Sequence, residues 1–311
     1  MENEEKKFFS IEKGGLVYHE RTSEGISRLI EVSKVLFSRK TKYQKIDVVE
    51  TPELGKALFI DGKIQLSALD EHIYHECLIH PALFSHPNPK TILIVGGGDG
   101  AALEEVLKHK TVEKAILVDI DEEIIEIAKK YLSDINRNSF EDPRVKVVVM
   151  DGREFITQCK EKFDIIILDL VDPYKEVSRL YTKEFYQICR EKLNENGILV
   201  THSQSPYLLQ KYFVTIHRTL ASVFRFVKSY GAWIPSFGLY WMFTIASDFV
   251  DPTKIEEEEI KKRLKERDVE TKYYHPKLHK ALFILPKDVE DALEKLEVEI
   301  STDKNPLELK V

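Results

Sequence analysis

The pattern of hydrophobic and polar positions divides the chain into two parts. Up to residue 67, short runs rich in β-branched and aromatic residues alternate with turn signals, which is typical of β-strands. Asp61-Gly62 lies between two apolar runs and predicts a type I′ hairpin turn. Residues 70–84 then have helical spacing. We therefore predict a small N-terminal β domain, residues 1–68, and a second domain, residues 69–311.

From residue 91 the second part alternates apolar runs with amphipathic segments. Continuous Val/Ile/Leu runs are typical of strands that are buried on both faces of a parallel sheet. Alternation of strand and helix predicts right-handed crossovers and a doubly wound α/β domain. The strands are expected at 91–95, 114–120, 145–150, 163–170 and 197–203, with late strands at 224–231 and 239–247. The helices are expected at 101–110, 121–132, 152–160 and 182–193.

Composition narrows the classes of function. The 311 residues are 43% hydrophobic and 32% charged, with a net charge of −7 and no long basic stripe, so nucleic acid is not expected as the main partner. No apolar run approaches the ~20 residues of a membrane helix, and the charged start is unlike a signal peptide. The three cysteines form no CxxC pattern. We expect a cytoplasmic protein, and the many Lys and Glu residues favour a thermophilic source.

A glycine loop and three acids predict an adenosine site. Gly96-Gly97-Gly98-Asp99-Gly100 follows the first strand of the second domain and opens a helix, where a backbone can approach a ligand closely. Asp119 ends the next strand, the position from which nucleotide-binding folds contact ribose, and Asp121 is an alternative helix cap. Asp151-Gly152 ends the third strand, at the place of an adenine edge. A plain tight turn is the alternative for the glycine loop.

The charge of Asp99 distinguishes between two kinds of donor molecule. A carboxylate in this loop repels a pyrophosphate or the carboxylate of S-adenosylmethionine, at a cost of about 4 kcal/mol at ~4 Å and an effective dielectric constant of ~20. The same carboxylate attracts an aminopropyl ammonium. The alternative is that Asp99 faces water at the helix start, favoured by the helix dipole.

The fourth strand ends in Asp169-Leu170-Val171-Asp172-Pro173. Ligands bind at the carboxyl edge of such sheets, and two carboxylates there suit a cationic substrate. One holds an ammonium while the other receives the proton of an attacking amine. The alternative is a pair of aspartates that stabilise the loop. Asp164 begins this strand and is expected to be structural.

Several motifs together resemble the polyamine aminopropyltransferases, the spermidine synthase family. They are DEHIYHE (70–76), GGGDG (96–100), VDID (118–121), EDPRV (141–145), DG (151–152), the DLVDP loop (169–173) and LYTKEFY (180–186). The resemblance covers nearly the whole chain. It implies a Rossmann-like, methyltransferase-type α/β fold with a small N-terminal β domain, assembled as a homodimer or homotetramer. It also implies transfer of the aminopropyl group of decarboxylated S-adenosylmethionine to a polyamine, with release of methylthioadenosine.

The resemblance assigns roles to residues by motif. It implies Asp169 as the acid that assists deprotonation of the acceptor amine. The donor-binding residues that it implies are Gln44, Asp99, Asp119, Asp151 and Gly152. The acceptor-binding residues that it implies are Gln65, Tyr74 and Asp172. It implies no metal and no cofactor besides the co-substrate. His75 and His80 are expected to be packing or hydrogen-bonding histidines.

Three departures from the common spermidine synthases leave the acceptor open. Leu170-Val171 replaces two hydroxyl residues, Ile234 lies where a tyrosine is expected, and His202 replaces a glutamine, with Gln204 nearby. These segments look more like the thermospermine synthase branch and crenarchaeal relatives. Trp233, Phe237 and Trp241 are either core aromatics or walls of a polyamine channel.

Two other functions fit the same pattern. A methyltransferase that uses intact S-adenosylmethionine shares the fold and the adenosine acids, although Asp99 and the acidic loop count against it. A non-catalytic nucleoside- or polyamine-binding protein would bind without turnover. The sequence leaves open the acceptor and the choice between dimer and tetramer.

Overall fold

The computed structural model describes residues 8–12 and 14–309. The chain forms two compact units. The first runs up to Glu71 and includes Ile234–Gly238, and the second comprises His72–Trp233 and the chain from Leu239 onward. The domain boundary predicted after residue 68 stays a prediction. Over the described residues, no helix combines the length and the apolar character that crossing a membrane requires.

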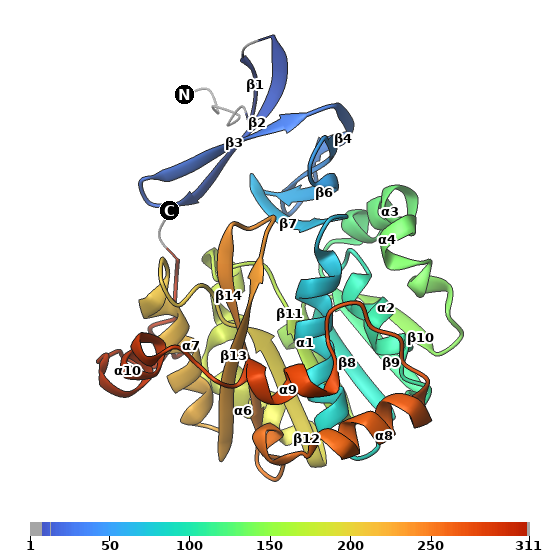
Figure 1. Ribbon diagram of the computed structural model, residues 1–311, viewed down its shortest axis with the longest axis vertical. Coiled ribbons are helices and arrows are strands. Elements are labelled where there is room, and N and C mark those ends of the chain that lie inside the picture. Colours follow the sequence, from blue (N-terminus) through green and yellow to red (C-terminus); the bar gives the residue numbers. More distant parts are fainter. Residues whose placement is uncertain (1–7, 13, 310–311) are drawn as a thin grey trace. The chain divides into compact units, whose positions relative to one another are not determined.

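The first unit contains two antiparallel sheets with the strand orders β1-β2-β3 and β4-β5-β6-β7 (Figure 1). The strands are β1 (Phe9–Glu12), β2 (Gly15–Ser23), β3 (Ile26–Val32), β4 (Lys34–Lys40), β5 (Lys45–Thr51), β6 (Gly55–Ile60) and β7 (Lys63–Ser67). Asp61 and Gly62 between β6 and β7 have φ values of 48° and 80°, the left-handed pair of a type I′ turn. Tyr18 lies at the centre of the core of this unit and stacks on Phe59.

The second unit contains a seven-stranded sheet with the order β10-β9-β8-β11-β12-β14-β13. The neighbours from β10 to β12 pair in parallel, and β14 pairs with β12 antiparallel. Its strands are β8 (Thr91–Gly96), β9 (Lys114–Asp119), β10 (Val145–Val149), β11 (Phe163–Asp169), β12 (Leu193–His202), β13 (Phe226–Ile234) and β14 (Leu239–Ser247). The doubly wound α/β fold and both late strands are therefore confirmed.

Helices flank this sheet on both faces (Figure 1). They are α1 (Glu71–Ser85), α2 (Ala101–Leu107), α3 (Glu122–Tyr131), α4 (Ser133–Asn136), α5 (Gly152–Gln158), α6 (Lys183–Glu191), α7 (Gln210–Ala221), α8 (Glu257–Arg267), α9 (Pro276–Leu282) and α10 (Lys287–Lys295). Three short 3₁₀ helices are η1 (Ser139–Glu141), η2 (Lys175–Tyr181) and η3 (Pro252–Lys254). Alternate residues of β8, β9 and β11 pack with α5, α6 and α7 in one hydrophobic cluster, which fixes the sheet against these helices.

Helix α1 is anchored at its C-terminal end by two arginines of α8. Arg267 is buried and donates to the carbonyl oxygens of Leu83, His86 and Pro87. Arg263, one turn earlier, donates to the carbonyls of residues 84–86. The last carbonyls of a helix have no partner within it, and here two guanidinium groups provide the missing donors.

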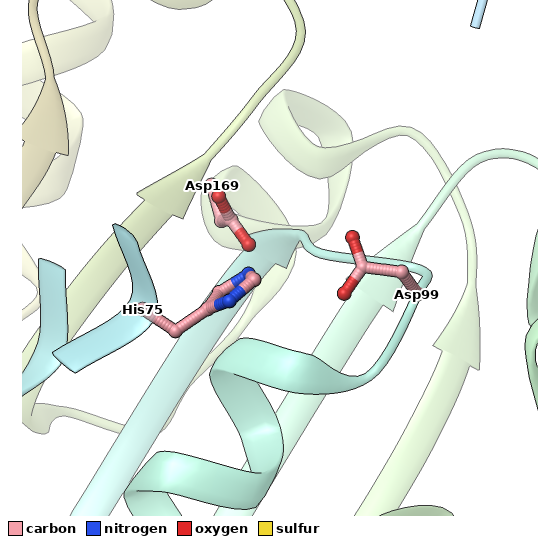
Figure 2. A group of neighbouring side chains, drawn as sticks. All are labelled: His75, Asp99 and Asp169. Carbon is pink, nitrogen blue, oxygen red and sulfur yellow. The ribbon is translucent and has the colours of Figure 1, made fainter. Parts of the chain in front are cut away.

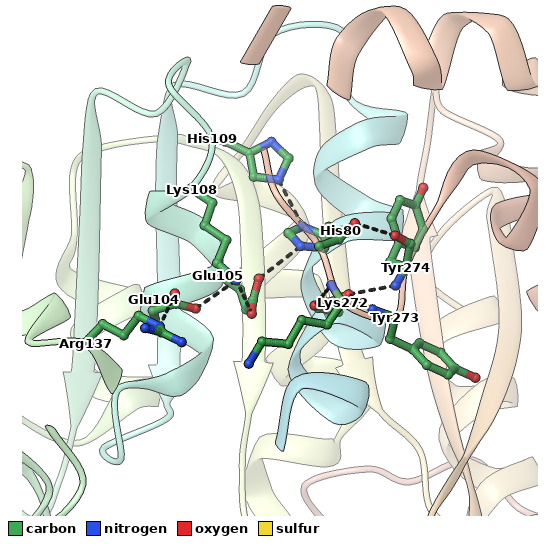
Figure 3. Close-up of polar contacts among 11 residues, drawn as sticks. His80, Glu104, Glu105, Lys108, His109, Arg137, Lys272, Tyr273 and Tyr274 are labelled. Carbon is green, nitrogen blue, oxygen red and sulfur yellow. Dashed lines mark hydrogen bonds and ion pairs between the residues drawn. The ribbon is translucent and has the colours of Figure 1, made fainter. Parts of the chain in front are cut away.

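A buried polar cluster joins α1 to α2 (Figure 3). His80 contacts Glu105 through Nε2 at 3.0 Å and His109 through Nδ1 at 3.1 Å. Burial alone would raise the pKa of Glu105, but the hydrogen bond and charge of His80, together with Lys108, lower it to about 2. His80 is thus the hydrogen-bonding histidine that the sequence suggests, and the cluster fixes two helices whose N-terminal ends carry predicted site residues.

Candidate active site

The predicted site residues of the second unit gather at one edge of its sheet. The parallel strands β10, β9, β8, β11 and β12 all end there, and in register Val149 lies opposite Asp119 and Asp169 opposite Gly96. The chain proceeds from β8 outward through β9 and β10, then returns to the other side of β8 with β11. The point between β8 and β11 is therefore the topological switch point, where ligands bind in open α/β sheets.

The glycine loop lies directly against the end of β11. The Gly97 amide donates to the Asp169 carbonyl at 2.9 Å. Gly96 has φ 81°, and a Cβ atom on it would lie 2.2 Å from the same carbonyl oxygen. Only glycine allows this approach, because any side chain would collide with backbone.

Asp99 projects from this loop toward a small polar cluster (Figure 2). One Asp99 oxygen accepts from the Ala101 amide at 2.8 Å at the start of α2. At the same time, single ligand atoms of His75, Asp99 and Asp169 all lie within 4.8 Å of one another. Asp99 therefore has both a local backbone partner and a place beside a second carboxylate.

Asp169 has a strongly perturbed carboxyl group. Tyr74, buried against Phe243, donates its hydroxyl to Asp169 Oδ1 at 3.2 Å. Desolvation, followed by the charge of Asp99, raises the pKa of Asp169 to about 7, against the opposing effects of His75 and Tyr74. A carboxyl group with this pKa exchanges a proton readily near neutral pH, which suits a general base.

Asp119 lies on the other side of the glycine loop. One of its carboxylate oxygens accepts from the Asp121 amide at 2.9 Å. Burial raises the pKa of Asp119 to about 6, with smaller contributions from Asp121 and Asp99. Asp121 accepts from the Glu123 amide at 3.1 Å and so caps α3, which confirms its structural alternative.

Asp151 and Gly152 follow β10 at the far end of the edge. Asp151 Oδ1 caps α5 by accepting from the Glu154 amide at 2.9 Å, and its Oδ2 forms an ion pair with Arg179. A Cβ atom on Gly152 would lie 2.3 Å from a methyl group of Val95, so close packing against β8 requires a glycine here.

Asp172 lies at the opposite end of the edge, beside β12. Gln204, directly after this strand, donates its amide nitrogen to Asp172 Oδ1 at 2.8 Å. His202 is buried, its ring stacks on Trp241, and its Nε2 lies 2.8 Å from the Leu170 carbonyl and 3.0 Å from the Tyr181 hydroxyl. Burial lowers the pKa of His202, against the charge of Asp172.

Two predicted site residues belong to the first unit. Gln44 closes a turn in which its backbone amide donates to the Thr41 hydroxyl at 3.1 Å. Gln65 lies on β7, and its side chain donates to the Lys63 carbonyl at 3.2 Å. Their place relative to the acidic edge of the second unit stays a prediction.

Comparison with known families identifies the family of this chain. Residues 71–254 match the spermine/spermidine synthase domain, and residues 16–68 match the spermidine synthase tetramerisation domain. The chain belongs to the spermidine synthase family. Aminopropyl transfer in polyamine biosynthesis is therefore its activity, and the methyltransferase alternative falls away.

Individual relatives are similar to this chain over most of its length. A polyamine aminopropyltransferase of Korarchaeum cryptofilum is 42% identical over 95% of this chain and 92% of the relative, and one of Saccharolobus solfataricus is 46% identical over 89% and 92%. The crystal structure of spermidine synthase from Thermotoga maritima has a TM-score of 0.82 at 35% identity, covering 89% of this chain and 94% of that one. A spermidine synthase in complex with the transition state analogue AdoDATO has a TM-score of 0.86 at 36% identity, covering 92% and 98%. The archaeal relatives fit the expected thermophilic source.

Sequence reasoning missed three residues of this edge. His75 is expected to be a packing or hydrogen-bonding histidine, and its ring lies beside Asp99 and Asp169. Its position next to Tyr74 within the matched segment DEHIYHE was the available signal. Arg179 pairs with Asp151, and Tyr181 donates to the Val171 carbonyl at 3.0 Å. The motif LYTKEFY contains Tyr181, but nothing in its spacing indicated this contact.

Proposed function

We propose that this family member uses decarboxylated S-adenosylmethionine as its aminopropyl donor and a polyamine amine as its acceptor. The observation that carries the proposal is the position of Asp99, whose carboxylate lies within one small cluster with Asp169 and His75. Opposite charges at such distances attract by a few kcal/mol, and like charges repel by as much. An aminopropyl ammonium is favoured there, and the α-carboxylate of intact S-adenosylmethionine is disfavoured.

Asp169 is the residue that we propose to receive the acceptor's proton. The neutral amine attacks the carbon beside the sulfonium, a C–N bond forms, the C–S bond breaks, and the sulfur leaves as the neutral thioether of methylthioadenosine. The proton lost from the amine passes to Asp169, whose raised pKa of about 7 makes it a stronger base than an ordinary carboxylate. Tyr74 orients this carboxylate through its hydroxyl.

The remaining acids have binding roles in this proposal. Asp119 holds the ribose, and Asp151 with Gly152 contacts the adenine edge, assisted by Gln44. Asp172 binds an ammonium of the acceptor, and Gln65 and Tyr74 lie where donor and acceptor meet. The reaction needs positioned charges and a base, and we propose no metal or further cofactor.

Spermidine is proposed to be at least as good an acceptor as putrescine. Ile234 lacks the hydroxyl group of the tyrosine that is expected at its position, and its side chain is buried. Val171 likewise lacks the hydroxyl group that its position is expected to carry. Leu170 packs against the hydrophobic core, so it contributes less to an acceptor wall than its sequence position suggests. Each methylene of a longer polyamine buried against apolar side chains contributes ~0.8 kcal/mol.

A binding experiment tests the donor. Calorimetry should show tighter binding of decarboxylated than of intact S-adenosylmethionine, and Asp99→Asn should narrow that difference. Asparagine keeps a side-chain oxygen that can accept from the Ala101 amide, so the change isolates the charge. Equal affinities of the unmodified chain for the two donors would contradict the proposal. Mass spectrometry of products from a mixture of putrescine, agmatine, spermidine and norspermidine identifies the acceptor.

Self-association completes the proposal. The first unit matches a tetramerisation domain and exposes apolar side chains on β1, β3 and β4, namely Ile11, Ile26, Leu29 and Val35. Covering them in a homodimer or homotetramer removes apolar surface from water. Light scattering measures the assembly.

Cytoplasmic localisation is part of the same proposal, and the cysteines of the described chain, all unpaired, accord with a reducing compartment.

A further inference from the structure

Gln204 has two unusual features for a residue at the end of a strand. Its φ is 74°, in the left-handed region that side chains other than glycine, asparagine and aspartate rarely adopt. Its backbone is held there by β14, because its carbonyl accepts from the Met242 amide at 3.0 Å and the Ser203 amide donates to the Met242 carbonyl at 2.7 Å. The strained backbone fixes where this side chain points.

The orientation of the Gln204 amide follows from its partner. A carboxylate accepts hydrogen bonds and donates none, so the atom 2.8 Å from Asp172 Oδ1 is the amide nitrogen. Oε1 therefore takes no part in the contact with Asp172. Gln204 is fully buried, and this oxygen has no hydrogen-bond partner among the residues that the structure describes. Buried acceptors are rarely left unpaired, so a missing donor is expected here.

His202 presents a second acceptor of the same kind. Its Nε2 carries the proton, because the Leu170 carbonyl can only accept. Its lowered pKa keeps the ring neutral near pH 7, which leaves a lone pair on Nδ1. That atom is also buried and without a partner in the described chain. Gln204 Oε1 and His202 Nδ1 are thus two buried acceptors without an N–H donor among the described residues, and a protonated amine is such a donor.

We propose that Gln204 is an acceptor-recognition residue that holds Asp172 in place through its amide nitrogen and receives an N–H of the polyamine at Oε1. This inference rests on the proposed function, since Asp172 binds the acceptor's ammonium there. Gln204 thereby adds a neutral acceptor to the carboxylate. This arrangement makes recognition of the amine directional. The Asp172 carboxylate and Gln204 Oε1 must both accept N–H hydrogen bonds, either from one nitrogen of the polyamine or from two adjacent nitrogens.

Two substitutions remove the side chain in different ways. Gln204→Met keeps its approximate size and removes both polar groups. Gln204→Gly removes the side chain while relieving the left-handed strain, and the melting temperatures of both variants show whether a loss of recognition is a loss of fold. Asp268→Gly is the matched control, because Asp268 also has a left-handed φ of 52° but lies exposed at the end of α8.

Steady-state kinetics and calorimetry test the proposal together. Both Gln204 variants should raise KM for spermidine and for putrescine by about 10- to 100-fold, the range for a lost hydrogen bond to a charged group, with KM for the donor changed less than twofold. Asp268→Gly should change neither value. Combining Gln204→Met with Asp172→Asn should cost clearly less than the two separate losses multiplied, because one residue acts partly through the other.

The outcomes separate this inference from the proposed function. If the unmodified chain makes no aminopropylated product from decarboxylated S-adenosylmethionine, the proposed function fails. Calorimetry of spermidine in the presence of methylthioadenosine then still measures whether Gln204→Met weakens amine binding. The role of Gln204 is overturned if acceptor KM and affinity change no more in the Gln204 variants than in Asp268→Gly. It is also overturned if the losses in the double variant are simply multiplicative.

Discussion

The two halves of the acidic edge are built differently. On the half formed by β8, β9 and β10, Asp99, Asp119 and Asp151 each commit one oxygen to a backbone amide two or three residues later. On the half formed by β11 and β12, Asp169 is held by Tyr74, 95 residues earlier, and Asp172 by Gln204, 32 residues later. By the roles proposed above, the first of these is called the nucleoside half and the second the amine half. The nucleoside half is held largely by local structure, whereas the amine half depends on tertiary contacts.

This difference has a chemical consequence. Backbone amides hold a carboxylate in a fixed direction and stabilise its charge. At Asp169 the side-chain contacts do not outweigh desolvation and the charge of Asp99, so its pKa is raised. Burial also raises the pKa of Asp119, to about 6, in spite of its backbone amide partner. Of these two buried acids, Asp169 with a pKa of about 7 is the stronger base.

The largest expected effect comes from Asp169→Asn. This change should lower turnover by roughly 10²–10⁴-fold, the usual contribution of a positioned acid–base group, while methylthioadenosine binding is retained. Asp164→Asn is the matched control at the other end of the same strand, where Asp164 accepts from the backbone of Lys90 and Thr91. Single-turnover rates for both variants provide the comparison. Near-normal turnover in Asp169→Asn would remove it from the catalytic role.

Thermal melting tests whether the loss of turnover in Asp169→Asn is caused by unfolding. The folded state raises the pKa of Asp169 above that of the unfolded chain, so folding favours the protonated form. The stability contributed by this group therefore falls as pH rises from its ordinary pKa toward about 7. Asp169→Asn removes this penalty, and its melting temperature should exceed that of the unmodified chain more at pH 8 than at pH 4.

The second effect is a pH dependence that only the amine half should produce. Asp169 must be ionised to accept a proton, which contributes about a tenfold rise in kcat/KM per pH unit below a pKa of about 7. The acceptor amine contributes a further rise of about tenfold per pH unit up to its own pKa of ~10, so the two rises multiply below a pH of about 7. In Asp169→Asn the limb near pH 7 should disappear and the amine limb should remain. An unchanged profile in the variant would assign the lower limb to another group.

Much of this site could be predicted because half of it is local. Continuous apolar runs indicated the parallel strands, and their ends placed Asp99, Asp119, Asp151 and Asp169 on one edge. The contacts of Gln204 were not predictable, because they depend on a left-handed backbone that β14 imposes. The ion pair of Arg179 with Asp151 likewise requires η2 to fold back toward the end of β10, which no spacing in the sequence indicates.

A smaller effect tests the nucleoside half. Arg179 pairs with the second oxygen of Asp151, which is the oxygen that we propose to accept from an adenine amino group. Arg179→Ala should strengthen methylthioadenosine binding about two- to fivefold, because an exposed ion pair contributes only ~0.2–1 kcal/mol. Arg190→Ala is the matched control, since Arg190 pairs with Asp248 and is 51% exposed against 49% for Arg179. Weaker binding in Arg179→Ala would indicate that Arg179 itself contacts the nucleoside.

The smallest effect is expected where the two halves meet. His75, Asp99 and Asp169 offer ligand atoms within 4.8 Å of one another, a geometry that suits either a divalent cation or an ammonium. If the donor's ammonium occupies this cluster, a bound metal would compete with it. Chelation should then leave kcat and donor KM unchanged, and millimolar Zn²⁺ should raise donor KM without lowering kcat. Activity lost on chelation and restored by one metal would assign the cluster to a cation, and Asp169 would then act as a ligand and not as the base.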